Sequence, residues 1–172
     1  MTDMPMLTQL GAWKGYGLED LPRVASEVTA ALPMSGVVAV HGAMGAGKTT
    51  LVRAVLQAWG SEEEGTSPTF GLVHHHSVLR QGQIFQVRHM DLYRLENEEE
   101  AERAGIADML LDEVLTLVEW PERVPGLMPD DAHLLQVEEL PNGTRQCILS
   151  VSYTHLRAHE TKANLVCRLL LE

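Results

Sequence analysis

The sequence predicts one α/β domain, because an apolar run typical of a buried strand is followed by a segment of helical periodicity. Val37 to Val40 is the apolar run, and a glycine-rich segment comes directly after it. Apolar residues then recur at helical spacing as far as Gly60. The chain has 172 residues, 45% hydrophobic and 22% charged, which is typical of one globular domain.

The remaining elements of the first half follow in chain order. An apolar stripe predicts a helix over 19–34, which Pro33 and Gly36 close. Two strand-like runs cover 70–79 and 83–91, and the pair Gln81-Gly82 lies between them. This arrangement predicts a β-hairpin.

The second half of the chain predicts further strands around one short helix. Residues 97–104 form an acidic helical segment, with Asn97 as its N-cap, Glu100 three residues later and Gly105 at its end. The last predicted elements are a buried strand, a loop with three prolines and two closing strands, over 114–120, 121–131, 134–138 and 145–151.

The charge of the chain excludes a protein that grips nucleic acid over a broad face, since 24 acidic residues oppose 13 basic ones for a net charge of −11. A small phosphate pocket remains compatible with that charge. Cys147 and Cys167 are too few for a disulfide framework or a cysteine metal site. No apolar run approaches ~18 residues, and the N-terminus lacks a signal-peptide layout. We therefore expect a cytoplasmic protein with no membrane partner.

The strongest functional signal is the segment Gly42-x-x-x-x-Gly47-Lys48-Thr49, which lies between the predicted strand and the predicted helix. Glycines let backbone N–H groups turn inward around a phosphate chain, where Cβ atoms would block the approach. The helix start adds its positive end. Lys48 can reach the outer phosphates, and the Thr49 hydroxyl can coordinate Mg²⁺. The alternative, a chance glycine-rich turn, does not account for the strand before it and the helix after it.

Two carboxylates end predicted strands, where open α/β sheets bind their ligands. Glu119 ends the apolar run that begins at Val114, and Asp91 ends the second strand of the hairpin. Either could hold a metal or orient a water, which nucleotide hydrolysis needs. Either could instead cap a loop or pair with Arg94 or Arg123. The spacing leaves open which of the two is the metal ligand.

Three further segments allow a functional and a structural interpretation. Ser67-Pro68-Thr69 could sense a terminal phosphate, as switch segments do, or be an ordinary turn. His74-His75-His76 alternates faces on a strand and has no nearby third ligand, so we favour strand residues over a metal site. The acidic run Glu96 to Glu102 is either a solvated helix face or a docking surface for a basic partner.

Taken together, four segments resemble the TsaE family of bacterial ATPases from tRNA threonylcarbamoyladenosine (t6A) biosynthesis. The resemblance runs from about residue 7 to about residue 150. The Asp-Leu-Tyr-Arg-Leu and Glu-Trp-Pro segments are more specific than the glycine loop, which many unrelated NTPases share. The matching segments are His41-Gly42-x-x-Gly45-Ala46-Gly47-Lys48-Thr49-Thr50, Ser67-Pro68-Thr69-Phe70, His89-Met90-Asp91-Leu92-Tyr93-Arg94-Leu95 and Val118-Glu119-Trp120-Pro121-Glu122.

The resemblance implies a three-layer P-loop NTPase-like domain with a mixed central sheet. It implies ATP and Mg²⁺ as cofactors, weak hydrolysis by the chain alone, and the TsaD and TsaB proteins as partners. Those partners modify adenosine 37 of ANN-decoding tRNAs, so tRNA would be met only through the complex. By position, Thr49 and Glu119 would hold Mg²⁺, and Asp91 would be catalytic or position water. The implied nucleotide-binding residues are Gly42, Gly45, Ala46, Gly47, Lys48, Thr49, Thr50, Thr69 and Trp120, and Lys48 would also act in catalysis.

The end of the chain departs from this resemblance. Residues 1–150 form the expected ATPase domain, whereas 151–172 resemble a translated adaptor or vector read-through. The alternative for this tail is an amphipathic helix with four apolar residues on one face, Leu165, Val166, Leu169 and Leu170. Two other functions also stay open for the domain. One is a nucleotide-dependent switch whose hydrolysis is incidental, and the other is a small-molecule kinase, although no arginine-rich lid is evident.

Overall fold

A computed structural model describes residues 6–63 and 71–152, and within them eight strands form one sheet. The strands are β1 (Leu7–Tyr16), β2 (Val37–His41), β3 (Glu62–Glu63), β4 (Val73–Arg80), β5 (Gln83–Asp91), β6 (Leu115–Glu119), β7 (His133–Glu139) and β8 (Arg145–Ser152). The helices are α1 (Leu21–Ala31), α2 (Lys48–Ala58), α3 (Glu98–Arg103) and α4 (Ile106–Leu111), with short 3₁₀ turns at Pro121–Arg123 and Pro125–Leu127.

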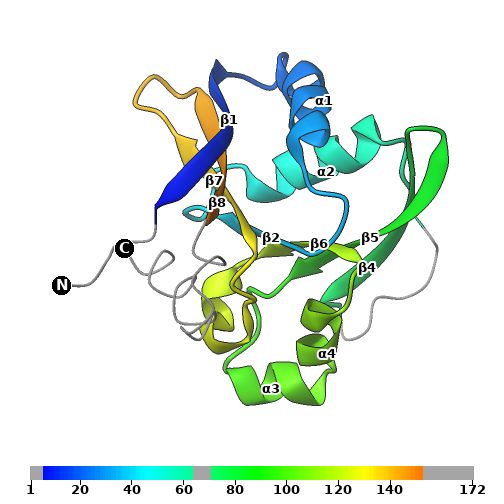
Figure 1. Cartoon of the computed structure of the whole chain (residues 1–172). Helices are drawn as coiled ribbons and strands as arrows, with labels where there is room; N and C mark the ends of the chain where they lie inside the picture. The colour runs from blue at the N-terminus through cyan, green and yellow to red at the C-terminus, as the bar shows by residue number, and fades with distance from the viewer. Residues whose placement is uncertain (1–5, 64–70, 153–172) are drawn as a thin grey trace.

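The sheet is mixed, as the sequence resemblance implied. Its order is β1-β8-β7-β2-β6-β5-β4-β3 (Figure 1). The central strands β7, β2, β6 and β5 pair in parallel, and the pairs toward both edges are antiparallel. The carboxyl ends of β2, β5 and β6 therefore meet at one edge of the sheet, where open α/β sheets bind ligands.

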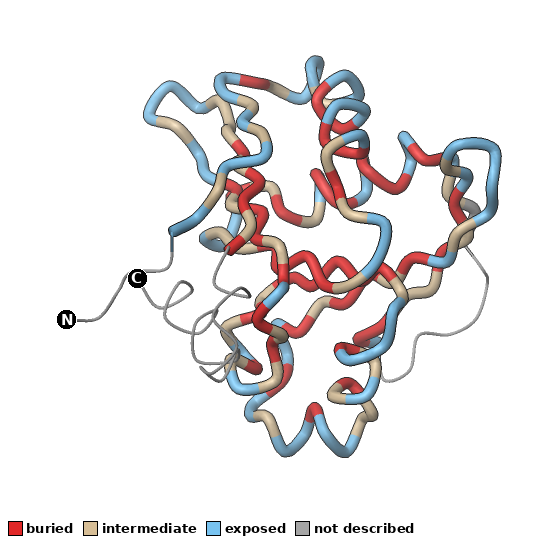
Figure 2. Tube along the Cα trace, viewed as in Figure 1, coloured by how far each residue is buried: buried red, intermediate tan, exposed pale blue. Residues whose placement is uncertain are grey.

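Helices cover both faces of the sheet, which gives the predicted three layers. Alternate residues of β2 belong to two separate apolar clusters, since Val38 and Val40 pack with α1 and α2 whereas Val37 and Ala39 pack with α3 and α4. Figure 2 shows the buried residues gathered along the central strands and the inward sides of the helices. Among the described helices, none is long and apolar enough to cross a membrane.

Most predicted elements are confirmed, with small shifts at their ends. The first helix is shorter than 19–34 because Leu32 is extended (ψ 148°), as residues before a proline tend to be. The hairpin is confirmed, and its two turn residues, Gln81 and Gly82, have φ values of 52° and 76°. The acidic helix is capped as predicted, because the Asn97 side chain accepts a hydrogen bond from the Glu100 N–H at 2.9 Å.

Three elements were missed, and one of them, β3, is a strand of only 2 residues within a segment, 61–68, whose polar residues predict a loop. The strand β1 has no regular inward and outward alternation, because its pairing with β8 shifts register between Gln9 and Gly11 and again between Lys14 and Tyr16. The helix α4 has only 6 residues, too few for a clear period. The predicted loop over 121–131 contains the two 3₁₀ turns.

The other expectations concern single segments. The three histidines lie in β4, where the His76 ring bonds to the Ser61 hydroxyl at 2.8 Å. Within 6–63 and 71–152, no group of three or more His, Cys, Asp or Glu side chains is arranged to hold a metal ion. Ser152 pairs with Leu7, so the strand β8 continues just past the predicted boundary at residue 150. The remainder of the tail lies outside the described residues.

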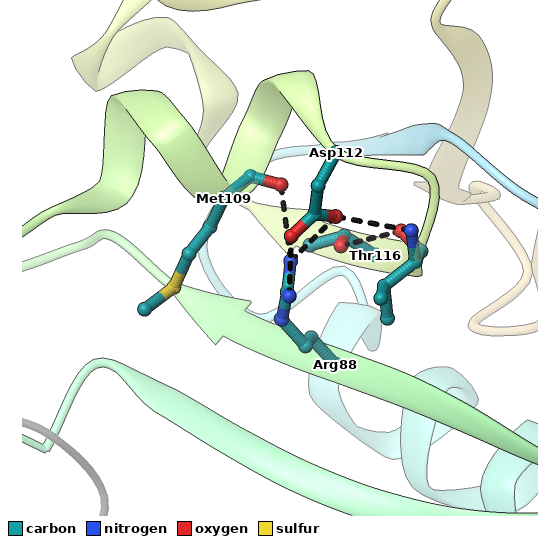
Figure 3. A network of polar contacts seen from close by, with 5 residues as sticks. Arg88, Met109, Asp112 and Thr116 are labelled. Carbon is teal, nitrogen blue, oxygen red and sulfur yellow. Dashed lines mark hydrogen bonds and ion pairs between the residues drawn. The ribbon is translucent and has the colours of Figure 1, made fainter.

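An ionic contact fastens the second layer of helices to the sheet, away from the glycine loop. The guanidinium of Arg88 on β5 donates to both carboxylate oxygens of Asp112 and, at 3.0 Å, to the carbonyl of Met109 (Figure 3). The same carboxylate accepts the Val114 N–H at 3.0 Å, at the turn that leads into β6. Arg88 is therefore used to hold α4 and is not an arginine of a phosphate lid.

This contact makes stability depend on pH. The Arg88 hydrogen bonds hold the pKa of Asp112 below its usual value, against the opposing effect of burial. Stability from such a carboxylate is present above its unfolded pKa and is lost as the pH falls through its folded pKa. Because Asp112 is 38% exposed, we expect Asp112→Asn to cost only about 1 kcal/mol at neutral pH.

Urea unfolding at pH about 7 and about 3 tests this expectation. The difference between Asp112→Asn and the unaltered protein should become smaller in acid, and the control Glu113→Gln, on an exposed neighbour, should show no difference at either pH. An equal loss at both pH values would contradict the ionic contact.

Candidate functional site

The glycine-rich loop joins β2 to α2, and its shape requires glycine. Gly45 and Gly47 have φ values of 81° and 101°, in the left-handed region that other residues rarely adopt. A Cβ at Gly42 would lie 2.3 Å from the carbonyl oxygen of Val137 on β7. The loop thus presses against the sheet and directs the start of α2, with its unpaired N–H groups, toward the carboxyl ends of the strands.

Lys48 lies at the start of α2 and is nearly buried, with 6% of its surface exposed. Its ammonium donates to the carbonyl oxygens of Gly42 and, at 3.1 Å, Ala43. It also lies 4.0 Å from the centre of the Trp120 ring. The loop therefore closes around the amine of its own lysine.

Burial lowers the pKa of Lys48, whereas the negative charges of Glu122, Glu119 and Asp91 oppose the shift without cancelling it. Three carboxylates thus act on one ammonium group. Around Lys48 these negative charges outnumber the ammonium, which favours a cation as part of what binds there.

Thr49 and Glu119 meet across the site, although they are 70 residues apart in the sequence. The Thr49 hydroxyl donates to Oε1 of Glu119 at 2.6 Å. The second oxygen, Oε2, lies 2.5 Å from Nε2 of His89 on β5. Glu119 is only 1% exposed, so both carboxylate oxygens are used within the protein.

Glu119 is ionised despite its burial. Desolvation raises its pKa, but the hydrogen bonds from His89 and Thr49, with the charges of His89 and Lys48, outweigh it and leave the pKa below the usual value. An ionised carboxylate only accepts hydrogen bonds, so Nε2 of His89 carries the proton.

Asp91 ends β5 directly beside Glu119, its register partner on β6. Its Oδ1 accepts the N–H of Tyr93 at 3.1 Å, which fixes the turn after the strand. Asp91 thus caps a loop, which is one of the two structural alternatives predicted for it, and no contact with Arg94 or Arg123 is seen for either carboxylate within the described residues. The Thr49 hydroxyl bonds to Glu119, a difference between the two acids that spacing could not show.

Trp120 follows Glu119 in a conformation that is rare for a bulky residue, with φ 58° and ψ 48°. This turn swings its ring over the Lys48 ammonium and 5.0 Å from the Tyr93 ring. The guanidinium of Arg123 lies 5.6 Å from the Tyr93 ring. Such strain is typical of functional sites. Thr69, the predicted switch residue, lies outside the described residues.

Three residues of the site were given no role from the sequence, although two of them, His89 and Glu122, lie in the segments that carry the family resemblance. His89 shares a strand face with Asp91 two positions later, a period that could have revealed it. Glu122 has a buried Oε2 that accepts no hydrogen bond from the described residues, and its charge acts on Lys48. Arg145, on β8, donates to the carbonyl oxygen of the nearby Gly143 at 2.9 Å and to that of Gly45 at 3.4 Å, and only the folded chain brings Arg145 and Gly45 together.

Two hollows flank the loop. One, of about 310 Å³, is bordered by Thr50, Arg145, Tyr16, Leu18 and Leu21. The other, of about 430 Å³, is bordered by Gly42, Met44, Glu138 and Glu139. Arg145 borders the first and two glutamates border the second, and Arg145 forms an ion pair with one of these, Glu139, at 3.2 Å.

Comparisons with known proteins point to one family. A family profile described as threonylcarbamoyl adenosine biosynthesis protein TsaE matches residues 17–147. The tRNA threonylcarbamoyladenosine biosynthesis protein TsaE of Haemophilus influenzae is 36% identical over 102 residues, covering 59% of this chain and 62% of that protein. Its counterpart in Treponema pallidum is 31% identical over 128 residues, covering 74% and 91%.

A solved structure shares the fold. The crystal structure of YdiB from Bacillus subtilis superposes with a TM-score of 0.62 over 96% of both chains, at 21% sequence identity. The mixed α/β architecture is thus that of a known protein.

Proposed function

Because the chain belongs to the TsaE family of tRNA threonylcarbamoyladenosine biosynthesis proteins, we propose that it binds and hydrolyses ATP, with Mg²⁺, as an accessory protein of t6A formation. The observation that carries this proposal is the meeting of the glycine loop, Lys48, Thr49 and the buried carboxylate of Glu119 at one edge of the sheet. Membership of the family does not by itself distinguish ATP hydrolysis from ATP binding.

The residues present fit a triphosphate. Gly45 and Gly47 have positive φ and carry no Cβ atom that could block a phosphate where the loop turns. The helix α2 begins directly afterwards, at Lys48. Lys48 would exchange the carbonyl oxygens of Gly42 and Ala43 for phosphate oxygens. The positive charge of Lys48 is thereby held ready at the place where phosphate charge must be neutralised.

The residues also fit a hard divalent cation, which prefers oxygen ligands. Thr49 and Glu119 would hold Mg²⁺, since their oxygens lie 2.6 Å apart and the carboxylate is ionised. When bound, Mg²⁺ supplies positive charge to the phosphate oxygens. Asp91, beside Glu119, would accept a hydrogen bond from the attacking water and orient it. Glu122 offers a second carboxylate for that water.

The nucleoside would occupy the hollow beside Thr50. Thr49, Glu119 and Asp91 mark the outer-phosphate end of the site, and Thr50 lies next along α2. Leu18, Leu21 and Tyr16 offer an apolar surface to a base, and Arg145 offers a cation. The other hollow is bordered by Glu138 and by Glu139, which is ion-paired with Arg145, and no lysine or arginine of the described residues lines it to attract a phosphate chain.

We propose TsaD and TsaB as the partners, because the family acts in t6A formation. The chain would contact tRNA only through the complex with these proteins, in the cytoplasm. The net charge of −11 suits a protein that acts through protein partners. The acidic helix α3 carries three glutamates in its first turn, which bond within the chain to Gly126, Arg103 and Glu96, so a docking surface for a basic region stays the alternative to a solvated helix face. A pure nucleotide switch is the other function to test, because it needs ATP binding but tolerates loss of hydrolysis.

The deciding experiment measures ATP hydrolysis by the purified protein, alone and with TsaD, TsaB and an ANN-decoding tRNA. We expect slow hydrolysis alone, faster hydrolysis with the partners, and sustained tRNA modification. In the Lys48→Ala protein, both the ATP hydrolysis and the sustained tRNA modification should be lost. Hydrolysis that ignores the partners, from a folded chain that binds ATP, would contradict the proposal. Phosphate transfer to a small acceptor would favour a kinase.

We also expect the tail to be dispensable for nucleotide binding. Since β8 continues to Ser152, a chain that ends there keeps its pairing with β1 and β7. The dissociation constant for ATP should stay within about twofold of the full chain. A soluble, folded 1–152 protein that has lost ATP binding would refute the proposed domain boundary near residue 150.

A further inference from the structure

His89 is the second contact of the buried Glu119 carboxylate, and neither the proposed chemistry nor the sequence motifs give it a role. It lies on β5 and is 8% exposed. Its Nε2 is 2.5 Å from Oε2 of Glu119, whereas Oε1 faces the Thr49 hydroxyl at 2.6 Å. The carboxylate is thus bound from two sides by residues of two different elements.

Two hydrogen bonds restrain the orientation of the Glu119 carboxylate more than one hydrogen bond does. The plane of a carboxylate turns easily about its last side-chain bond, because that torsion is broad and nearly two-fold. A hydrogen bond at one oxygen leaves this rotation partly free. A second hydrogen bond at the other oxygen fixes the plane and decides where Oε1 points.

His89 is itself held rigidly enough for this task. Its backbone pairs on both sides, opposite Leu117 on β6 and opposite His74 on β4. The His74 ring packs beside it with 6.1 Å between ring centres. A ring enclosed in this way keeps its Nε2 directed at one place.

We propose that His89 is a positioning residue of the nucleotide site, whose Nε2–H holds the Glu119 carboxylate turned toward Thr49. In that orientation the Thr49 and Glu119 oxygens face one place, where a single divalent cation can reach both. The inference rests on the proposed ATP and Mg²⁺ site. Partners of metal ligands typically contribute about 10- to 100-fold to metal affinity or activity.

The test uses the full chain, ADP and Mn²⁺, with free Mn²⁺ counted by electron paramagnetic resonance. His89→Gln keeps an N–H donor near the position of Nε2. His89→Asn is too short to reach Glu119, and His89→Leu has no donor. His75→Gln is the matched control, because His75 lies on the neighbouring strand opposite Arg88. ADP affinity without metal is measured in EDTA for every variant.

We expect the Leu and Asn variants to bind Mn²⁺ about tenfold or more weakly in the presence of ADP. Their ADP affinity in EDTA should stay within about twofold, and His89→Gln should restore Mn²⁺ binding to within about threefold of the unaltered protein. This pattern separates positioning from a general loss of structure. If His89→Leu fails to fold, the comparison of Asn with Gln decides.

Unchanged Mn²⁺ affinity in the Asn and Leu variants would overturn the inference, as would a Gln variant as weak as Asn. Failure of the proposed function has a different signature. The unaltered protein would then fail to take up Mn²⁺ with ADP, and the role of His89 would fall with the site it serves.

Discussion

Lys48→Ala is expected to weaken ATP binding by about 2–3 kcal/mol, or roughly 30- to 150-fold, because it removes the one side-chain cation enclosed by the described part of the loop. Lys48 is 6% exposed, and its ammonium contacts two carbonyl oxygens and the Trp120 ring. Its hydrogen bonds to a phosphate would therefore be formed away from water, where charge-assisted contacts are strongest.

Equilibrium titration with a fluorescent ATP analogue measures the loss, and two variants serve as controls. Lys48→Met keeps the side-chain stem against Trp120 and removes only the charge, so it should match Lys48→Ala. Lys14→Ala removes an exposed lysine of β1 and should leave binding unchanged. A Met variant that binds like the unaltered protein would show that the charge of Lys48 is not used.

The pH dependence of binding gives an independent check. Burial lowers the pKa of Lys48, so the ammonium loses its proton at a lower pH than an exposed lysine would. Only the protonated form pairs with phosphate. ATP binding should therefore decline as the pH rises through this lowered pKa, and the Met variant should show no such decline.

The strand–loop–helix unit was predictable from the sequence because its determinants are local. The apolar run of β2, the glycines with positive φ and the periodicity of α2 are all properties of neighbouring residues. The mixed sheet came from the family resemblance. The strand β1 escaped prediction because its register shifts remove the alternation that marks a strand.

The choice between Asp91 and Glu119 was not local, and no spacing could decide it. Both acids end parallel strands and are register partners. They differ in one contact, because the Thr49 hydroxyl, just after the glycine loop, donates a hydrogen bond to Glu119. The role of His89 was not assigned for a similar reason, since its contact with Glu119 forms only when β5 and β6 are paired, although the residue lies in one of the segments that carry the family resemblance.

Glu119→Gln is expected to reduce Mg²⁺-dependent ATP turnover by about 100-fold or more, with the fold intact. Glutamine has nearly the same shape, and its amide can still bond to Thr49 or His89. What glutamine lacks is the negative charge of Glu119, a buried side chain that is 1% exposed and ionised in the unaltered protein. Thr49→Ala should lower turnover in the same direction, because it removes the second proposed metal ligand.

The effect of Glu119→Gln on binding should reverse with the metal. In EDTA the ATP phosphates face three carboxylates that act on Lys48, so removing one charge should leave ATP binding equal or tighter. In Mg²⁺ the same variant should bind ATP more weakly than the unaltered protein, since the cation has lost an anionic ligand. Steady-state hydrolysis and titrations in both conditions measure this reversal, with Glu102→Gln, an exposed residue of α3, as the control. Unchanged hydrolysis in Glu119→Gln would remove this residue from the site, and Asp91 would then be the acid to test, because it is the only other carboxylate among the described residues that ends a strand directly beside Glu119.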